Sequence, residues 1–133
     1  MTQICRQIYN KISDATQTVA MPTMPIIMEY KYSFEKLEVW NDARNLVKMI
    51  YLHTNNFPER ERFGLSSQMQ RTVVSIVSNI AEGVSRNSVK EKIRFVELAY
   101  GSLMELYCQL YVSVDLDYLT PNTFTLIKVE IAH

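Results

Sequence analysis

A long helical pattern of apolar residues over positions 89–116 constrains the fold more than any other feature of the chain. The apolar residues recur every three or four positions, as on one face of an α-helix: Ile93, Val96, Tyr100, Leu103, Tyr107, Leu110 and Val114. At about 1.5 Å per residue, this helix would be roughly 42 Å long. Further apolar residues widen the stripe, so we expect burial both in the core and at an oligomer interface. The candidate interface residues are Phe95, Leu98, Leu106 and Tyr111.

Two shorter helical patterns precede the long one. The first covers residues 34–54, with Ser33 as its expected N-cap and Pro58 beyond its end. The second covers residues 67–82, where β-branched residues would also suit a strand. A helical period sustained over the whole segment favours a helix there. Its expected end signals are a capping-box spacing and a glycine in the left-handed conformation, at Ser67, Gln70 and Gly83.

The last two segments carry start signals of their own. Ser88 and Glu91 have capping-box spacing at the start of the long helix. Thr120–Pro121 is a favourable N-cap and first-turn pair for a fourth, shorter helix. Positions 124–131 also alternate as strands do, so a strand is the alternative there. The four segments together predict an all-α, up-and-down four-helix bundle with a short fourth helix.

Composition limits the class of protein. The 133 residues are 47% hydrophobic, which suffices for one domain with its own core and excludes a disordered chain. No apolar run reaches the roughly 18 residues that a membrane span needs. The two cysteines are too few for a disulfide scaffold or a zinc-finger ligand set, which predicts a reducing, cytoplasmic setting. Because Pro22 and Pro25 interrupt the start, we expect residues 1–29 to be a poorly packed extension and residues 30–133 to form the bundle domain.

The residues that an enzyme would need are sparse. A carboxylate-bridged metal site in a four-helix bundle takes Glu-x-x-His motifs from opposed helices, and His53 and His133 are the only histidines. Cys108 lies on the apolar long helix, away from any histidine in the sequence, and is expected to be a small core residue. The three glycines are isolated, so there is no glycine-rich phosphate loop. We therefore predict no enzyme activity, no cofactor, no metal and no small-molecule substrate.

Charge is unevenly distributed, although 14 basic and 14 acidic residues make the total zero. Residues 58–94 carry seven basic and four acidic residues, a net charge of +3, whereas residues 95–133 carry one basic and five acidic residues, a net charge of −4. Three of the basic residues are spaced four apart near the start of the long helix, so they share one face. A charged turn is also typical of an ordinary solvent-exposed loop. The candidate contacts to RNA phosphates are Arg86, Lys90, Arg94, Lys92 and Arg71.

The most distinctive string in the chain is Ser78–Gly83. One interpretation makes Asn79 and Glu82 part of a shared binding site. We favour a structural interpretation, in which Asn79 bonds within a tight helix crossing and Glu82 pairs with Arg86 or Arg94. The tyrosines at positions 100, 107 and 111 are likewise expected in the core or at a subunit contact, rather than in a base-stacking platform.

Short motifs occur in order along the chain: Phe34–Trp40, Phe57–Pro58, Arg62–Leu65, Ser78–Gly83, Arg94–Phe95 and Ala99–Ser102. Over residues 30–120 this series resembles the four-helix bundle proteins found as open reading frames in intervening sequences of bacterial 23S rRNA genes. The resemblance implies an up-and-down bundle that assembles into a homopentamer. It also implies distant kinship with accessory proteins of diversity-generating retroelements, which bind nucleic acid beside a reverse transcriptase. Members of the family usually have a longer fourth helix and begin near the position of Tyr30.

The sequence thus leads to a hypothesis about partners. We predict a non-enzymatic homo-oligomer, a pentamer by resemblance, that binds RNA or a ribonucleoprotein through the turn between the second and third helices. Copies arranged in a ring would repeat that basic turn around the assembly. The alternative is a structural or adaptor oligomer whose working surface binds protein. Neither hypothesis involves a membrane.

Overall fold

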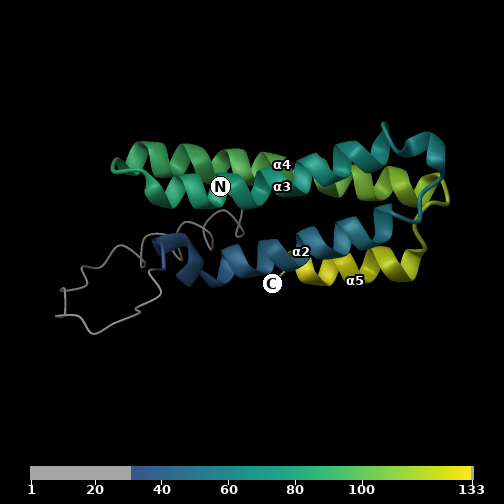
Figure 1. The fold of residues 1–133 in the computed structure, drawn as a ribbon, viewed down its shortest axis with the longest axis horizontal. Helices are drawn as coiled ribbons and strands as arrows, with labels where there is room; N and C mark the ends of the chain where they lie inside the picture. The colour runs from purple at the N-terminus through teal and green to yellow at the C-terminus, as the bar shows by residue number, and fades with distance from the viewer. Residues whose placement is uncertain (1–30, 133) are drawn as a thin grey trace.

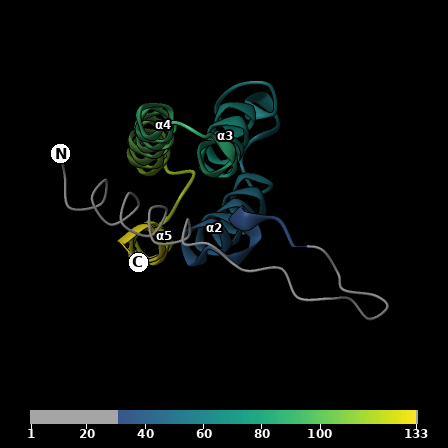
Figure 2. The same ribbon diagram turned by 90° about the vertical axis from the view of Figure 1, so that its left-hand side faces the viewer.

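The computed structural model describes residues 31–132, and within them the chain is all-α. The elements in order are the 3-10 turn η1 (Ser33–Lys36), α2 (Glu38–Thr54), the 3-10 turn η2 (Glu59–Glu61), α3 (Leu65–Ser85), α4 (Val89–Asp115) and α5 (Pro121–Ala132). Successive helices run in opposite directions, so the predicted up-and-down four-helix bundle is confirmed (Figure 1). Seen along the bundle, α3 and α4 form one layer, and α2 and α5 form the other (Figure 2). The extension predicted for residues 1–29 lies outside the described residues.

The fourth helix is short, as predicted. Helix α5 has 12 residues against 27 in α4, so it covers less than half of the length of α4. Positions 124–131 are helical rather than extended. Both predicted start signals work: the Ser88 hydroxyl oxygen accepts the Glu91 N–H at 3.1 Å, and the Thr120 hydroxyl oxygen accepts the Thr123 N–H at 3.1 Å.

Helix α2 begins differently from the prediction. Ser33 lies in η1 and does not cap α2, which starts at Glu38. Leu37, between the two elements, is buried, and its carbonyl oxygen accepts the Asn41 side-chain amide at 3.0 Å. The break between η1 and α2 therefore allows the chain to bury Leu37 before the regular helix begins.

The ends of α3 also differ from the prediction. The helix begins at Leu65, before the expected cap at Ser67, because a Glu61 carboxylate oxygen accepts the Leu65 N–H at 3.0 Å. At its other end the helix continues to Ser85, and Gly83 does not have a positive φ. A Cβ atom at Gly83 would lie 2.9 Å from the Phe95 Cβ. The glycine therefore allows α3 and α4 to approach closely, instead of ending the helix.

The core is formed by apolar side chains from all four helices. Burying each of them contributes about 1.5–3 kcal/mol relative to leaving it exposed. Leu106, which the sequence analysis placed at an oligomer interface, is one of them: its side chain is 0% exposed in the single chain, so it offers no surface to a second copy. The most deeply buried large apolar side chains are Ile50, Met69, Val73, Ile80, Leu106, Leu110 and Ile127.

Helix α4 ends in a Schellman motif whose left-handed residue is Asp117. The Tyr118 N–H donates to the Ser113 carbonyl oxygen at 2.8 Å, and the Asp117 N–H donates to the Val114 carbonyl oxygen at 3.0 Å. Asp117 has a φ of 58°, and among residues 31–132 no other non-glycine residue has a positive φ. Its backbone is therefore strained, because a Cβ is present at a positive φ, and its negative charge lies at the negative end of the helix dipole.

Asp117→Gly is expected to raise the free energy of unfolding by about 0.5–1 kcal/mol, because it relieves the strain and removes the charge. Urea denaturation followed by circular dichroism measures the change. Asp117→Asn is the control, since it removes the charge but leaves a side chain at the same φ, and it should gain less. A glycine variant less stable than the wild type would contradict the strain argument.

Candidate nucleic-acid interface

The candidate interface lies at the turn between α3 and α4, where residues 86–88 connect the two helices (Figure 1). Ser88 caps α4, and the N–H groups of the first turn of α4 give this end a partial positive charge. Four of the five predicted RNA-binding residues lie in this turn or in the first two turns of α4: Arg86, Lys90, Lys92 and Arg94.

Arg86 is the anchored member of this group. Its guanidinium forms an ion pair with Glu82, one turn earlier in α3. The same guanidinium lies over the Phe95 ring, with its Cζ 4.9 Å from the ring centroid. Its Nε atom is buried and has no hydrogen-bond partner within residues 31–132. Because Glu82 balances the charge of Arg86, Arg86 contributes less to an anion site than its position in the sequence suggests.

Lys90 and Arg94 are exposed and lie one helical turn apart on α4. Neither forms an ion pair with any residue in the described part of the chain. Lys92 is half-buried. Arg71 is exposed but lies roughly 22 Å from Arg86 along α3, at ~1.5 Å per residue, so it stands apart from the turn. The available positive charge of the turn therefore comes mainly from Lys90 and Arg94.

The Ser78–Gly83 string makes contacts within α3, with the turn and with α4. The Asn79 side-chain amide donates to the Ser75 carbonyl oxygen at 2.9 Å. The Ser75 hydroxyl in turn lies 3.0 Å from the Ser102 hydroxyl of α4. Glu82 pairs with Arg86 at the end of α3, whereas Gly83 packs directly on Phe95 of α4 beneath the basic turn.

One outer side of α4 exposes apolar side chains and is the candidate contact between copies. Leu98 is 46% exposed and Tyr111 is 48% exposed, whereas Phe95 is half-buried beneath Arg86. Cys108 is also exposed, which corrects its prediction as a core residue. Tyr111 packs edge-on against Tyr107, and the hydrogen bond between their hydroxyls raises the pKa of Tyr111. This side of α4 therefore combines apolar surface with phenol groups.

The described residues also bear on metal binding and on membrane crossing. Within residues 31–132 no group of three or more His, Cys, Asp or Glu side chains is placed to hold a metal ion. His53 is half-buried in the last turn of α2, and His133 lies outside the described residues. None of the described helices combines the length and the apolarity that crossing a bilayer requires.

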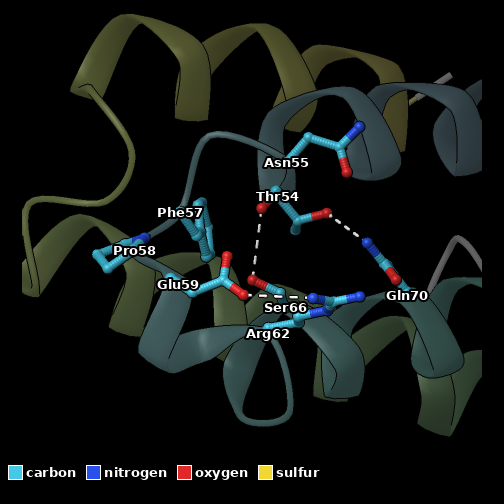
Figure 3. A pocket seen from close by; sticks show the side chains of 8 residues that line it. All are labelled: Thr54, Asn55, Phe57, Pro58, Glu59, Arg62, Ser66 and Gln70. Atoms are coloured by element: carbon cyan, nitrogen blue, oxygen red, sulfur yellow. Dashed lines mark hydrogen bonds and ion pairs between the residues drawn. The ribbon is translucent and has the colours of Figure 1, made fainter.

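A cavity of about 290 Å³ lies at the other end of α3, where the chain passes from α2 to α3 (Figure 3). Gln70 Nε2 donates to Thr54 Oγ1 at 2.9 Å, and the Ser66 hydroxyl donates to the Thr54 carbonyl oxygen at 3.4 Å. The sequence-based reasoning missed this site, because its polar groups come from two helices and no local motif marks them. The lining residues are Thr54, Asn55, Phe57, Pro58, Glu59, Arg62, Ser66 and Gln70.

The chain matches a known protein family over a range that includes both the α3–α4 turn and the cavity. A family model described as the 23S rRNA-intervening sequence protein matches residues 35–133 of the chain. The match therefore includes α2, α3, α4 and the described part of α5. No curated protein matches the chain.

Proposed function

Because the chain belongs to the family of 23S rRNA-intervening sequence proteins, we propose that it is a non-enzymatic homo-oligomer that binds RNA through the α3–α4 turn. This membership confirms the resemblance seen in the sequence motifs. The family is not a known family of enzymes. The proposal places the protein in the cytoplasm, and it takes the assembly to be a pentamer.

The observation that carries the RNA-binding proposal is the exposed pair formed by Lys90 and Arg94. The pair lies within the first two turns of α4, where the positive end of the helix dipole adds to its charge. Phosphate groups bind such basic clusters without regard to sequence. Arg86, stacked on Phe95 and paired with Glu82, supports the shape of the turn more than its charge.

The proposal of self-association is supported by the exposed outer side of α4. Exposed apolar side chains on one side of a helix favour a contact with another protein surface. In a ring of copies, each turn would add its own Lys90 and Arg94, so phosphate binding would be stronger than for a single chain. The exposed members are Leu98, Met104, Cys108, Tyr111 and Val112 on α4 and the C-cap residue Leu116.

The double variant Lys90→Ala/Arg94→Ala is expected to weaken binding to a structured RNA about tenfold at low salt. It should also reduce the magnitude of the slope of log K against log salt concentration by about 1–2, because fewer phosphates are neutralised. Fluorescence anisotropy of a labelled RNA over a salt series measures both quantities. Arg44→Ala/Lys48→Ala is a matched control, since these residues are an exposed Arg and Lys with the same spacing on α2. Equal losses in the two double variants would contradict the assignment to the turn.

A second candidate function is a structural or adaptor oligomer that binds a protein. It is favoured by exposed apolar residues on α5, where Leu126 and Val129 face away from the core. The two functions separate in the same experiment, because an adaptor would show no salt-dependent RNA binding. Light scattering adds a direct check of self-association, and the molar mass of a single chain would contradict the oligomer in both proposals.

A further inference from the structure

Phe63 is the most exposed large apolar side chain in the described part of the chain, at 87%. It lies between η2 and α3, in a segment that its neighbours hold in place. One Glu61 carboxylate oxygen accepts the Leu65 N–H at 3.0 Å, and the other accepts the Tyr118 hydroxyl at 3.2 Å. Arg60 also donates to the Tyr118 hydroxyl oxygen, at 3.0 Å. The exposed ring is therefore presented by a fixed loop.

Gly64 makes this arrangement possible. A Cβ atom at Gly64 would lie 2.7 Å from the Glu61 oxygen that accepts the Leu65 N–H. In the residues just before Gly64, the Arg62 Cζ lies 5.6 Å from the centroid of the Phe63 ring. Arg62 also lines the cavity between α2 and α3. Phe63 is thus linked to that cavity through Arg62, one of its lining residues, and does not line the cavity itself.

The cavity offers hydrogen-bonding groups in fixed positions (Figure 3). Thr54 Oγ1 donates to the Ile50 carbonyl oxygen at 2.8 Å and accepts from Gln70 Nε2 at 2.9 Å. The Gln70 amide is therefore held by its nitrogen, which leaves its carbonyl oxygen as an acceptor. The Asn55 amide lines the same cavity from the end of α2. At about 290 Å³ the cavity is at the small end of ligand sites, so it suits one planar ring system.

We propose that Phe63 and this cavity form a site for a single unpaired base of an RNA. The exposed ring provides a face on which a base stacks, and stacking on aromatic side chains is the usual way in which proteins bind unpaired bases. The amides of Asn55 and Gln70 each offer a donor and an acceptor, which match the edges of a base. The inference rests on the proposed function and adds a second RNA contact, roughly 30 Å from the basic turn along α3.

Charge favours a base over the phosphate backbone at this end of the bundle. Residues 59–62 contain two glutamates and two arginines, so the segment is neutral. Arg62 also pairs with Glu59 at 3.3 Å. A protein partner is a poorer match, because the cores of protein interfaces are mainly apolar, whereas most residues that line the cavity carry hydroxyl, amide or charged groups.

The test compares two RNA hairpins that differ by one bulged nucleotide. The wild-type chain is expected to bind the bulged hairpin more tightly. Phe63→Ala should lower the affinity for the bulged hairpin about tenfold and remove the preference, because base stacking is lost. Phe63→Trp should restore it. Fluorescence anisotropy of each labelled hairpin at one fixed salt concentration measures the affinities.

Two controls define the outcomes. Leu126→Ala removes another exposed apolar side chain, on α5, and should leave the preference unchanged. Lys90→Ala/Arg94→Ala should weaken binding to both hairpins equally. A wrong assignment of the phosphate contact at the turn is therefore distinguishable from a wrong assignment of the base site. Equal affinity of the wild type for the two hairpins would overturn the base site. A Phe63→Ala variant that keeps the preference but changes the molar mass of the assembly would also overturn it, and would assign Phe63 to a protein contact.

A second measurement does not depend on the basic turn. Nucleoside 5′-monophosphates at millimolar concentration are titrated into the full chain, and NMR follows the Phe63 ring and the Gln70 side-chain amide. Shifts at both groups are expected in the wild type and not in Phe63→Ala. If neither hairpin bound but these shifts appeared, the proposed function would fail and the base site would stand. No shift at either group would overturn the site.

Discussion

Leu106→Ala is expected to lower the free energy of unfolding by about 2–5 kcal/mol, the largest loss that we predict for a single substitution. The Leu106 side chain is 0% exposed and belongs to the apolar core that α4 shares with the other helices. Removing it leaves a cavity, because close-packed neighbours relax only partly. Urea denaturation followed by circular dichroism, at two protein concentrations, measures the loss.

Leu98→Ala is the matched control for this prediction. Leu98 lies on the same helix, but 46% of it is exposed in the single chain. Its substitution should lower the free energy of unfolding of the single chain by less than about 1 kcal/mol. The reason is that burial contributes ~25 cal/mol per Å² of apolar area, and Leu98 is only partly buried. If Leu98 contacts a second copy, its effect will depend on protein concentration, whereas the effect of Leu106→Ala will not. A Leu106→Ala variant as stable as the wild type would contradict the placement of Leu106 in the core.

The number and order of the helices could be predicted from the sequence because their signals are local. The helical period of the long segment requires no knowledge of its neighbours. The caps at Ser88 and Thr120 are equally local, since each hydroxyl bonds to an N–H three residues later in the chain. These signals were sufficient to predict a four-helix bundle with a short fourth helix.

The signals that failed depend on residues outside the helix concerned. Glu61, in the preceding loop, caps α3, so the capping-box spacing at Ser67 was misleading. The width of the apolar stripe on α4 showed that more than one side carries apolar residues, but not which side meets α3. As a result Leu106 was assigned to an interface and Cys108 to the core, and the structure reverses both assignments.

The candidate sites show the same division. The spacing of Lys90 and Arg94 placed them on one face, because that relation holds within one helix. Arg86 precedes α4 in extended backbone, so the same spacing does not place it on that face. The sequence could not show that Arg86 stacks on Phe95. Phe63 was missed altogether, since its exposure follows from the way that the loop around it is held. Features that depend on contacts between elements require the structure.

The last prediction uses a close contact between two helices. Gly83→Ala is expected to lower the free energy of unfolding by about 1–2 kcal/mol, although alanine favours helices more than glycine does by up to about 1 kcal/mol. The added Cβ would lie 2.9 Å from the Phe95 Cβ. Because the Phe95 Cβ is bonded directly to the backbone of α4, it can move away only if the helix moves with it. The loss measures the cost of separating α3 from α4 at the basic turn.

Gly101→Ala provides the matched control, because the same substitution meets no atom within 4 Å on the exposed side of α4. It should raise the free energy of unfolding by about 0.5–1 kcal/mol through helix propensity alone. Thermal and urea denaturation of the two variants under identical conditions gives the comparison. If both substitutions stabilised the chain equally, the contact at Gly83 would not be tight. Opposite signs would show that Gly83 holds the basic turn against α4 through close packing.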